Sequence, residues 1–434
     1  DLEALKLVRK TPLTAAQMKS DEALVEDVNH LMPRSDWQTL DNPLHAFKRV
    51  AKGARIAKPK HIFLIVGESI PQWSMDPLYM NFNICPGLRE FAADVHTACV
   101  PNFLPAGNVS RPSISSLISG IYDSGMELNE KEIFWNNTLP TALAAQIKRL
   151  GYQTIYWYGG NSSSGNFTKY GKAQGFDRIE NATEFCGPQA LQTWLGVYDH
   201  VFLEEAAKRI VAMDEPTFHF VYTTTNHGPY KLEDKYLEFD AHRDLPGVGD
   251  DILNRKDGNK GLATYKYCDK AIFDFVDAMK AKFPDSLFIV TGDHSNLFGE
   301  FNNTSFLHRD YTMREIRNTV FYMQHPELSQ TSIPASIGTH LSIMPTIIEA
   351  IAPKGFEYYA AVPSAFDEQP DVHVTPYQWI TSDMVGDVLG DYGQYQTYTA
   401  EPSEYIRPID NHAQDAEYWR SLSAWMMKFY ANVQ

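Results

Sequence analysis

The stretch His61-Ile-Phe-Leu-Ile-Val66, followed by Gly67-Glu68-Ser69, decides the fold of this chain. Its continuous apolar run over residues 62–66 is typical of a strand buried on both faces, as in a parallel sheet covered by helices. Ligands and reactive groups in such sheets gather beyond the carboxyl ends of the strands. Glu68 is therefore the first candidate site residue.

Similar apolar runs recur along the chain, and helical patterns separate them. We predict further strands over residues 153–158, 218–224, 286–290 and 318–323. We predict helices over residues 110–120, 139–150, 201–213, 265–282 and 341–351. This alternation predicts an α/β fold with a central, mostly parallel sheet and helices on both of its faces.

The chain divides into three predicted parts. Residues 1–58 are polar and are predicted to form a helical lead-in, whereas residues 59–354 carry the alternation of strands and helices and are predicted to form the core. Beyond residue 354 the alternation stops, so residues 355–434 are predicted to form a small C-terminal subdomain that packs on the core. The closing helix there has an apolar stripe typical of packing, formed by Tyr418, Leu422, Trp425 and Phe429.

The composition is that of an acidic globular protein. The 434 residues include 38 Lys and Arg against 54 Asp and Glu, for a formal net charge of −16, and 44% of them are hydrophobic. The acidity argues against a nucleic-acid partner, because phosphate backbones would be repelled. No apolar run approaches the roughly 20 residues of a membrane-spanning helix. Because the first residue is Asp1 rather than Met, we expect a processed or truncated chain.

One segment reverses the prevailing charge, and two interpretations of it stay open. Between residues 48 and 60 no acidic residue occurs, and the basic residues are Lys48, Arg49, Lys52, Arg55, Lys58 and Lys60. Such a segment either lies near anionic lipid headgroups or forms a solvated helix face, and the second is the commoner case.

The cysteines also leave two readings open. Cys85, Cys99, Cys186 and Cys268 have no metal-binding spacing. Cys85 and Cys99 are close enough in sequence to form a disulfide in an oxidising compartment, but four buried free thiols are equally compatible with the sequence.

An Asp-His pair follows another predicted strand. Asp293 and His294 come just after the strand over 286–290, so both side chains emerge at its carboxyl end. Carboxylate and imidazole together suit Mn²⁺, Zn²⁺ or Mg²⁺. Glu68 faces the same sheet edge, and a metal shared with the pair would offset the cost of burying that carboxylate. The alternative is a loop-capping Asp293 beside an ordinary surface histidine.

Two further segments carry groups suited to phosphate chemistry. The loop Gly107-Asn-Val-Ser110 leads into the helix predicted over 110–120, whose N-terminus favours an anion. A serine hydroxyl there, beside a divalent cation, can attack phosphorus, although a serine-rich helix start is more often only a cap. Asn226-His227 follows the strand over 218–224, where an imidazole can donate to a phosphoryl oxygen or protonate a leaving alkoxide.

The order of these motifs resembles that of the alkaline phosphatase/sulfatase superfamily. The order is Gly67-Glu-Ser69, Ser110-x-x-Ser113, Asn226-His-x-Pro229 and Gly292-Asp-His294. More specifically, residues 59–350 resemble the extracytoplasmic catalytic domains of lipoteichoic acid synthase-like phosphoglycerol transferases. Such enzymes usually have a membrane-spanning bundle before the domain, and residues 1–58 look like the linker that joins the two.

The resemblance implies the roles of several residues. It implies one divalent metal, commonly Mn²⁺ with Mg²⁺ or Zn²⁺ as alternatives, held by Glu68, Ser110, Asp293 and His294. Ser110 would be the nucleophile, and His227 would bind the substrate phosphate and act in catalysis. The further candidates for substrate binding are Arg111, Asn226 and His308. His308 follows a Gly-Glu stretch, as in phosphoethanolamine transferases, whereas His340 is predicted to be structural.

The chain also departs from the family patterns. The nucleophile position holds Ser110 where these synthases usually have Thr, and Ile114 stands where the Cys/Ser-x-Pro-x-Arg motif of sulfatases has Arg. The first strand ends in Gly-Glu-Ser rather than in the paired Asp of sulfatases. Residues 164–168 lack the Trp and Arg that contact glycerol phosphate in the synthases.

The function expected from these residues is a metal-dependent transfer of a phosphoglycerol-type headgroup. The donor would be a phospholipid, the acceptor a glycan or glycerol phosphate, and the intermediate a covalent adduct of Ser110. The alternatives are a phosphoethanolamine transferase, a phosphodiesterase or phosphatase of the same fold, a sulfatase, and a non-catalytic headgroup- or glycan-binding module. The expected location is extracytoplasmic, at a membrane surface reached through preceding transmembrane segments.

Overall fold

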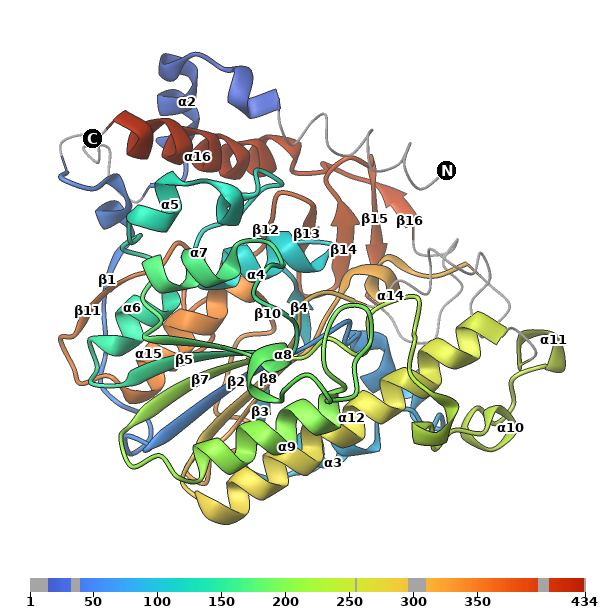
Figure 1. Ribbon diagram of the computed structural model, residues 1–434. Coiled ribbons are helices and arrows are strands. Elements are labelled where there is room, and N and C mark those ends of the chain that lie inside the picture. The colour runs from blue at the N-terminus through green and yellow to red at the C-terminus, as the bar shows by residue number, and fades with distance from the viewer. Residues whose placement is uncertain (1–14, 33–39, 254–255, 296–309, 397–405, 433–434) are drawn as a thin grey trace.

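A seven-stranded sheet forms the centre of the computed structural model, which describes residues 15–32, 40–253, 256–295, 310–396 and 406–432 (Figure 1). The strand order is β3-β9-β8-β2-β7-β5-β6. Their bounds are β2 His61–Gly67, β3 Thr97–Cys99, β5 Gln153–Tyr158, β6 Arg178–Asn181, β7 Thr217–Tyr222, β8 Leu287–Gly292 and β9 Phe321–Gln324. The five strands from β8 to β6 run parallel, and β9 is antiparallel to its neighbours β8 and β3.

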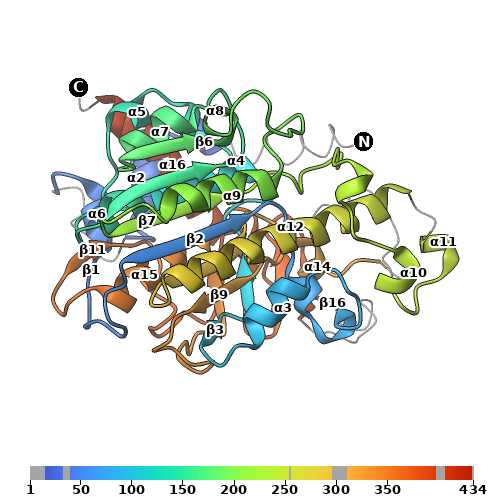
Figure 2. The same cartoon turned by 60° about the horizontal axis from the view of Figure 1, so that its bottom comes forward.

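Helices cover both faces of this sheet, as the sequence predicts. On one face lie α3 (Pro86–Ala93), α9 (Asp199–Ile210) and α12 (Lys256–Lys282), which Figure 2 shows side by side. On the other face lie α4 (Ser110–Ser119), α6 (Leu143–Lys148), α7 (Phe167–Ala173) and α15 (Ile343–Ile351). Strand β2 supplies both cores, because Leu64 packs in the core of α4 and α6 while Phe63 packs in that of α12.

Most of the predicted elements are present with small shifts of their ends. The strand predicted over 153–158 is β5, and the helix predicted over 110–120 is α4. Gly120 ends α4 in the left-handed conformation, with φ +73°, which glycine adopts without steric cost. The strand expected over 318–323 begins later, at Phe321, and the helix expected over 265–282 begins earlier, at Lys256.

The C-terminal part forms a second, smaller sheet. Its five antiparallel strands are β12 His373–Val374, β13 Gln378–Ile380, β14 Met384–Asp387, β15 Tyr392–Tyr395 and β16 Ile406–Pro408. The closing helix α16 (Ala413–Asn432) packs against α2 (Asp21–Val28) near the start of the described chain (Figure 1). Leu422 of the predicted stripe is buried, and the ring of Tyr418 stacks on His30 at 4.3 Å.

The remaining elements are short. Two strand pairs lie outside the larger sheets, namely β1 (Lys48–Val50) with β11 (Glu357–Tyr359) and β4 (Asn102–Leu104) with β10 (Ile337–Thr339). The short helices are α5 Ile133–Asn136, α8 Ala182–Phe185, α10 Ala241–Asp244, α11 Asp250–Leu253 and α14 Met313–Arg317.

The prediction that residues 1–58 are helical is wrong at β1, where the chain pairs with β11. Residues 1–14 and 33–39 of that prediction lie outside the described residues.

The basic segment over residues 48–60 is not a helix face. It consists of β1 and a stretch without regular secondary structure, and several of its cations contact groups within the protein. Lys48 pairs with Glu357 at 2.5 Å, and Lys52 pairs with Asp367 at 2.5 Å. The guanidinium carbon of Arg55 lies 4.5 Å from the centre of the Phe366 ring. Lys48, Lys52 and Arg55 thus each contact a side chain of the C-terminal part.

The structure also bears on disulfide formation and on membrane-spanning helices. All four cysteines are free thiols, so Cys85 and Cys99 form no disulfide here. Across the described residues, every helix is too short or too polar to span a lipid bilayer.

Candidate active site

Adjacent strands bring the candidate residues to one edge of the sheet. Glu68 follows β2, and Asp293 and His294 follow its neighbour β8, with Gly67 and Gly292 opposite each other in the register. Ser110 is the first residue of α4, which begins at the same edge. The metal-ligating atoms of Glu68, Asp293 and His294 lie within 4.8 Å of one another, and all three side chains are buried. The four predicted metal ligands are thus brought together.

The serine oxygen lies against this cluster. Ser110 Oγ is 3.3 Å from Glu68 Oε2 and 3.3 Å from His294 Nε2. His294 Nε2 is also 3.5 Å from Glu68 Oε1 and 3.4 Å from Asp293 Oδ2. Because His294 Nδ1 lies 2.6 Å from the carbonyl oxygen of Ser295, it must donate there, which leaves a lone pair on Nε2. This is the tautomer that a metal-ligating histidine needs.

The electrostatics of the cluster favour a bound cation. Burial, together with the charge of Asp293, raises the pKa of Glu68 to about 7. Two buried carboxylates at this distance are stabilised when a cation compensates their charge. Two carboxylates, an imidazole and a hydroxyl are also suitable donors for Mn²⁺, Mg²⁺ or Zn²⁺. The residues present therefore fit a divalent metal.

Tyr222 completes the cluster, and the sequence reasoning missed it. Its hydroxyl is 2.9 Å from Glu68 Oε2 and 3.1 Å from Asp293 Oδ2. Its ring stacks on Tyr158 of β5, with centroids 5.5 Å apart and an interplanar angle of 10°. The available signal was its place at the end of a predicted strand, but only the register, which sets Tyr222 opposite Val66, brings it beside Glu68.

The loop after β7 presents His227 next to the cluster. Asn226 Nδ2 donates to the backbone oxygen of Glu68 at 3.1 Å, so this side chain ties the loop to the end of β2. His227 Nδ1 lies 2.6 Å from the carbonyl oxygen of Gly228 and donates to it, so Nε2 is the ring nitrogen left to exchange a proton. Arg111, the second residue of α4, is exposed beside Ser110.

Asp199 fixes this loop by hydrogen bonds, and the sequence does not identify it as a site residue. Its Oδ1 accepts hydrogen bonds from the backbone of Thr224 at 3.2 Å and of Thr225 at 3.1 Å, and from Thr225 Oγ1 at 2.8 Å. Asp199 is fully buried at the start of α9. The helix predicted over 201–213 began two residues too late to include it.

The two remaining histidines have different outcomes. His308, a candidate for substrate binding, lies outside the described residues. His340 is buried, and its Nδ1 accepts from the backbone N–H of Ala106 at 3.1 Å while its Nε2 donates to the oxygen of Gly292 at 2.9 Å. Burial lowers the pKa of His340 to about 4, so the ring is neutral. A structural role for His340 agrees with these contacts.

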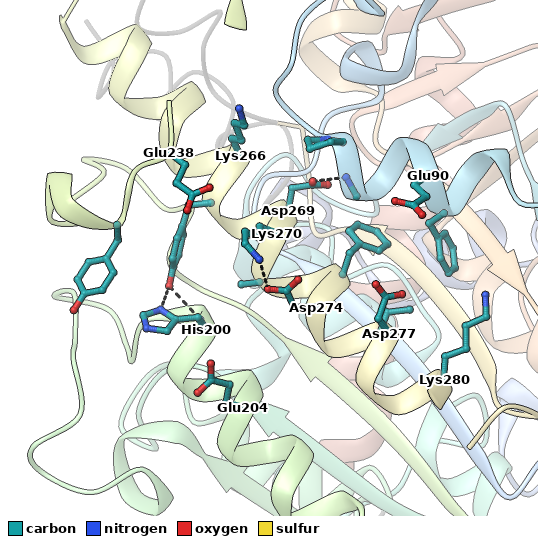
Figure 3. A pocket seen from close by; sticks show the side chains of 18 of the residues that line it. Glu90, His200, Glu204, Glu238, Lys266, Asp269, Lys270, Asp274, Asp277 and Lys280 are labelled. Carbon is teal, nitrogen blue, oxygen red and sulfur yellow. Dashed lines mark hydrogen bonds and ion pairs between the residues drawn. The ribbon is translucent and has the colours of Figure 1, made fainter. Parts of the chain in front are cut away.

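A wide cavity lies elsewhere, between α3, α9 and α12 (Figure 3). It has a volume of about 620 Å³, and none of its lining residues belongs to the cluster at the strand ends. Both acidic and basic side chains line it, and Lys270 pairs with Asp274 at 2.6 Å. Asp269 accepts from the backbone of Gly87 at 2.7 Å and so caps α3. The catalytic candidates therefore do not lie in this cavity.

Relatives of the chain include two staphylococcal proteins. A lipoteichoic acid synthase of Staphylococcus aureus is 22% identical over 430 residues, which cover 96% of this chain and 63% of the synthase. One of Staphylococcus saprophyticus is 23% identical over 309 residues, which cover 68% of this chain and 46% of that protein. The chain thus spans about half to two thirds of the length of these relatives.

Solved structures share the fold. An alkaline phosphatase superfamily protein from Vibrio parahaemolyticus matches with a TM-score of 0.68 and 18% identity, over 95% of this chain and 97% of that one. The lipoteichoic acid synthase LtaP from Listeria monocytogenes matches with a TM-score of 0.66 and 13% identity, over 94% and 97%. The C-terminal periplasmic domain of EcEptC from Escherichia coli matches with a TM-score of 0.54 and 15% identity, over 78% and 95%.

These likenesses show an alkaline-phosphatase-like fold. A family profile described as Sulfatase matches residues 60–351, which include every strand of the central sheet and the whole cluster at the strand ends. The chain therefore belongs to the Sulfatase family, an enzyme family whose members include phosphotransferases and esterases.

Proposed function

We propose that this chain transfers a phosphoglycerol-type headgroup from a phospholipid to a glycan or glycerol acceptor, with Ser110 as the covalent nucleophile. One observation carries the proposal. Ser110 Oγ, at the N-terminus of α4, lies 3.3 Å from both Glu68 and His294 of a buried cluster suited to a divalent metal. The staphylococcal relatives, which are lipoteichoic acid synthases, support the choice of headgroup.

The first displacement cleaves the donor. Ser110 Oγ attacks the phosphorus, and the bond between phosphorus and the glycerol oxygen of diacylglycerol breaks. The backbone N–H groups at the start of α4 bind the phosphoryl oxygens, whose negative charge the helix dipole stabilises. His227, protonated on Nε2, gives its proton to the leaving oxygen. The proton of Ser110 goes to the carboxylate oxygen Glu68 Oε2, which lies 3.3 Å from Ser110 Oγ.

The second displacement reverses these roles. His227 Nε2, now unprotonated, accepts the proton of the acceptor hydroxyl as its oxygen attacks the phosphorus. The bond between phosphorus and Ser110 Oγ breaks, and the serine regains from Glu68 the proton that it gave up in the first displacement. The headgroup ends on the acceptor, and no electron is gained or lost.

Glu68, Ser110, Asp293 and His294 would hold the metal, with Mn²⁺ our proposed ion. When bound, a divalent cation there favours the deprotonated serine and offsets the charge of the phosphate. Arg111 and Asn226 remain our candidates for substrate binding, since Arg111 is exposed beside Ser110 and Asn226 lies next to His227. The proposed setting is the outer face of a membrane, where the phospholipid headgroup is within reach.

The experiment that tests this proposal is intact-protein mass spectrometry. The wild-type chain is incubated with Mn²⁺ and either phosphatidylglycerol or phosphatidylethanolamine, beside Ser110→Ala and Ser113→Ala. We expect an adduct with the mass of glycerol phosphate in the wild type and in Ser113→Ala. Ser113 is a suitable control because its hydroxyl donates a hydrogen bond to the Gly107 carbonyl oxygen at 2.9 Å. Ser110→Ala should give none. An adduct that persists in Ser110→Ala would remove Ser110 as the nucleophile.

The same incubations, with an alcohol acceptor added and the released products analysed, separate the alternatives. An adduct with the mass of ethanolamine phosphate would identify a phosphoethanolamine transferase. Turnover to water alone, with no alcohol accepted, would identify a phosphodiesterase or phosphatase. A small mass loss at Ser110 before any substrate is added would indicate formylglycine and a sulfatase. Metal binding without turnover of any ester would indicate a binding module.

A further inference from the structure

Trp194 is an exposed aromatic ring beside His227. It is 61% exposed, whereas Trp73, Trp157 and Trp379 are each 1% exposed or less. Its ring meets that of His227 edge to face, with centroids 5.1 Å apart and an interplanar angle of 78°. A large apolar ring left in water next to a candidate catalytic group needs an explanation, because tryptophan is normally well buried.

The turn that carries Trp194 is tied within itself. The backbone N–H of Thr193 donates to the oxygen of Gly196 at 2.8 Å. Thr193 Oγ1 accepts from the backbone of Leu195 at 3.2 Å and of Gly196 at 3.3 Å. These bonds satisfy the turn without any help from the Trp194 ring, so its backbone is held while the side chain remains accessible.

The turn is also fixed to the end of β5. Gly196 forms a bridge with Gly160, and the next residue, Val197, donates to the oxygen of Gly159 at 2.9 Å. A Cβ on Gly196 would lie 2.3 Å from that same oxygen, so the two segments are in backbone contact. The tryptophan is therefore presented by a rigid support rather than by a loose loop.

The segment after Gly160, the residue that bridges to Gly196, is polar. Asn161, Ser162 and Ser163 follow Gly160 directly and are all exposed, and Ser163 Oγ donates to Asn161 Oδ1 at 2.5 Å. Amide and hydroxyl groups both donate and accept hydrogen bonds, as a ligand with many hydroxyls requires. An aromatic face combined with a few such groups is a common way to bind and orient a small ligand.

We propose that Trp194, with the polar run over residues 161–163, forms the subsite for a sugar ring of the acceptor. This inference rests on the proposed function and names the class of its acceptor. A sugar ring has apolar C–H faces that lie against Trp194 and hydroxyls at its edge that reach the polar run. One of those hydroxyls then lies next to His227.

The chemistry at this subsite is the second displacement. The sugar hydroxyl oxygen forms a bond to the phosphorus, and the bond between phosphorus and Ser110 Oγ breaks. The hydroxyl proton goes to His227 Nε2, and Ser110 regains its own proton from Glu68. Trp194 forms and breaks no bond, and therefore affects how often the acceptor rather than water takes the headgroup.

The test measures that partition. The Mn²⁺-loaded chain is given a water-soluble nitrophenyl ester of glycerol phosphate, and nitrophenol release reports donor cleavage. Methyl glucoside or glycerol is the acceptor, and product analysis gives the ratio of transfer to hydrolysis. For Trp194→Ala we expect transfer to methyl glucoside to fall about tenfold while transfer to glycerol and nitrophenol release stay near wild type. Trp194→Phe, which retains an aromatic ring, should recover most of the transfer to the glucoside.

Several outcomes would overturn the inference. An unchanged transfer ratio in Trp194→Ala would show that the ring does not bind the acceptor. A fall in nitrophenol release at an unchanged ratio would assign Trp194 to the donor instead. A defect seen only with phosphatidylglycerol vesicles would assign it to the membrane surface. A wild-type chain that hydrolyses the ester but transfers to no alcohol would refute the transferase proposal itself, and a thermal melt of each variant checks folding.

Discussion

At the scale of single residues, Tyr222 makes one hydroxyl serve two carboxylates. It reaches Glu68 Oε2 at 2.9 Å and Asp293 Oδ2 at 3.1 Å, whereas Ser69 binds the other oxygen of each carboxylate. Tyr222→Phe removes this hydroxyl and keeps the ring, so we expect the affinity for Mn²⁺ to fall about tenfold in isothermal titration calorimetry. Tyr158→Phe makes the same change on the stacked ring and should keep the wild-type affinity. An equal loss in both variants would contradict this role.

The pKa of Glu68 predicts how metal binding depends on pH. Because that pKa is raised to about 7 in the metal-free protein, the carboxyl carries a proton at lower pH, which the metal must displace. We expect the dissociation constant for Mn²⁺ to be about tenfold larger at about pH 6 than at about pH 8. Binding of the metal at the lower pH should release about one proton. Calorimetry in buffers of different ionisation enthalpy measures both quantities. A dissociation constant that does not vary over this range would exclude the assignment.

The same raised pKa affects folding, with the opposite dependence on pH. An acid whose pKa is higher in the folded state than the ordinary 4.5 stabilises the fold less as pH rises from about 4.5 to about 7. The free energy of unfolding of the metal-free protein should therefore fall over this range. Glu68→Gln should remove that part of the decrease, as urea unfolding at several pH values would measure. A parallel decrease in the variant and the wild type would mean that other groups cause it.

At the scale of elements, the connection between α9 and the loop after β7 controls where His227 lies. Asp199→Ala deletes the acceptor of three hydrogen bonds from Thr224 and Thr225. We expect kcat/KM for the donor to fall by about tenfold to a hundredfold, because a misplaced catalytic group is costly, while the affinity for Mn²⁺ stays near wild type. Asp199→Asn retains a side-chain oxygen and should lose less. A fall in metal affinity equal to that in kcat/KM would indicate general damage to the site.

Elements also show what the sequence can predict. Glu68, Asp293 and His294 can be identified from the sequence because each follows a long apolar run, which marks the end of a buried strand. Tyr222 cannot, because its role depends on the register between β2 and β7, which are distant in the chain. The strands of the C-terminal sheet cannot be predicted from the sequence either, because the described strands have only two to four residues and show no hydrophobic period.

At the scale of the whole molecule, the C-terminal helix supports the segment that follows the nucleophile helix. Ser423 Oγ of α16 donates to the backbone oxygen of Tyr122 at 2.5 Å and lies 3.0 Å from Ser124 Oγ. Trp419 meets the ring of Tyr122 edge to face at 5.0 Å. Lys19, near the start of the described chain, pairs with Glu417 of α16 at 2.6 Å. The first and last described parts of the chain, around Lys19 and in α16, are thus packed on the core that carries Ser110.

This packing predicts that the three parts of the chain unfold together. Trp419 is 9% exposed, so Trp419→Ala should lower the free energy of unfolding by about 3–5 kcal/mol and shift the whole transition. Trp194→Ala is the matched control, because that ring is 61% exposed and its loss should change stability by less than about 0.5 kcal/mol. Calorimetry should show one transition in all three proteins. Two separate transitions, with only one displaced by Trp419→Ala, would mean that the C-terminal part folds independently. The contacts of α16 with the segment after the nucleophile helix would then not couple the stability of the C-terminal part to that of the core.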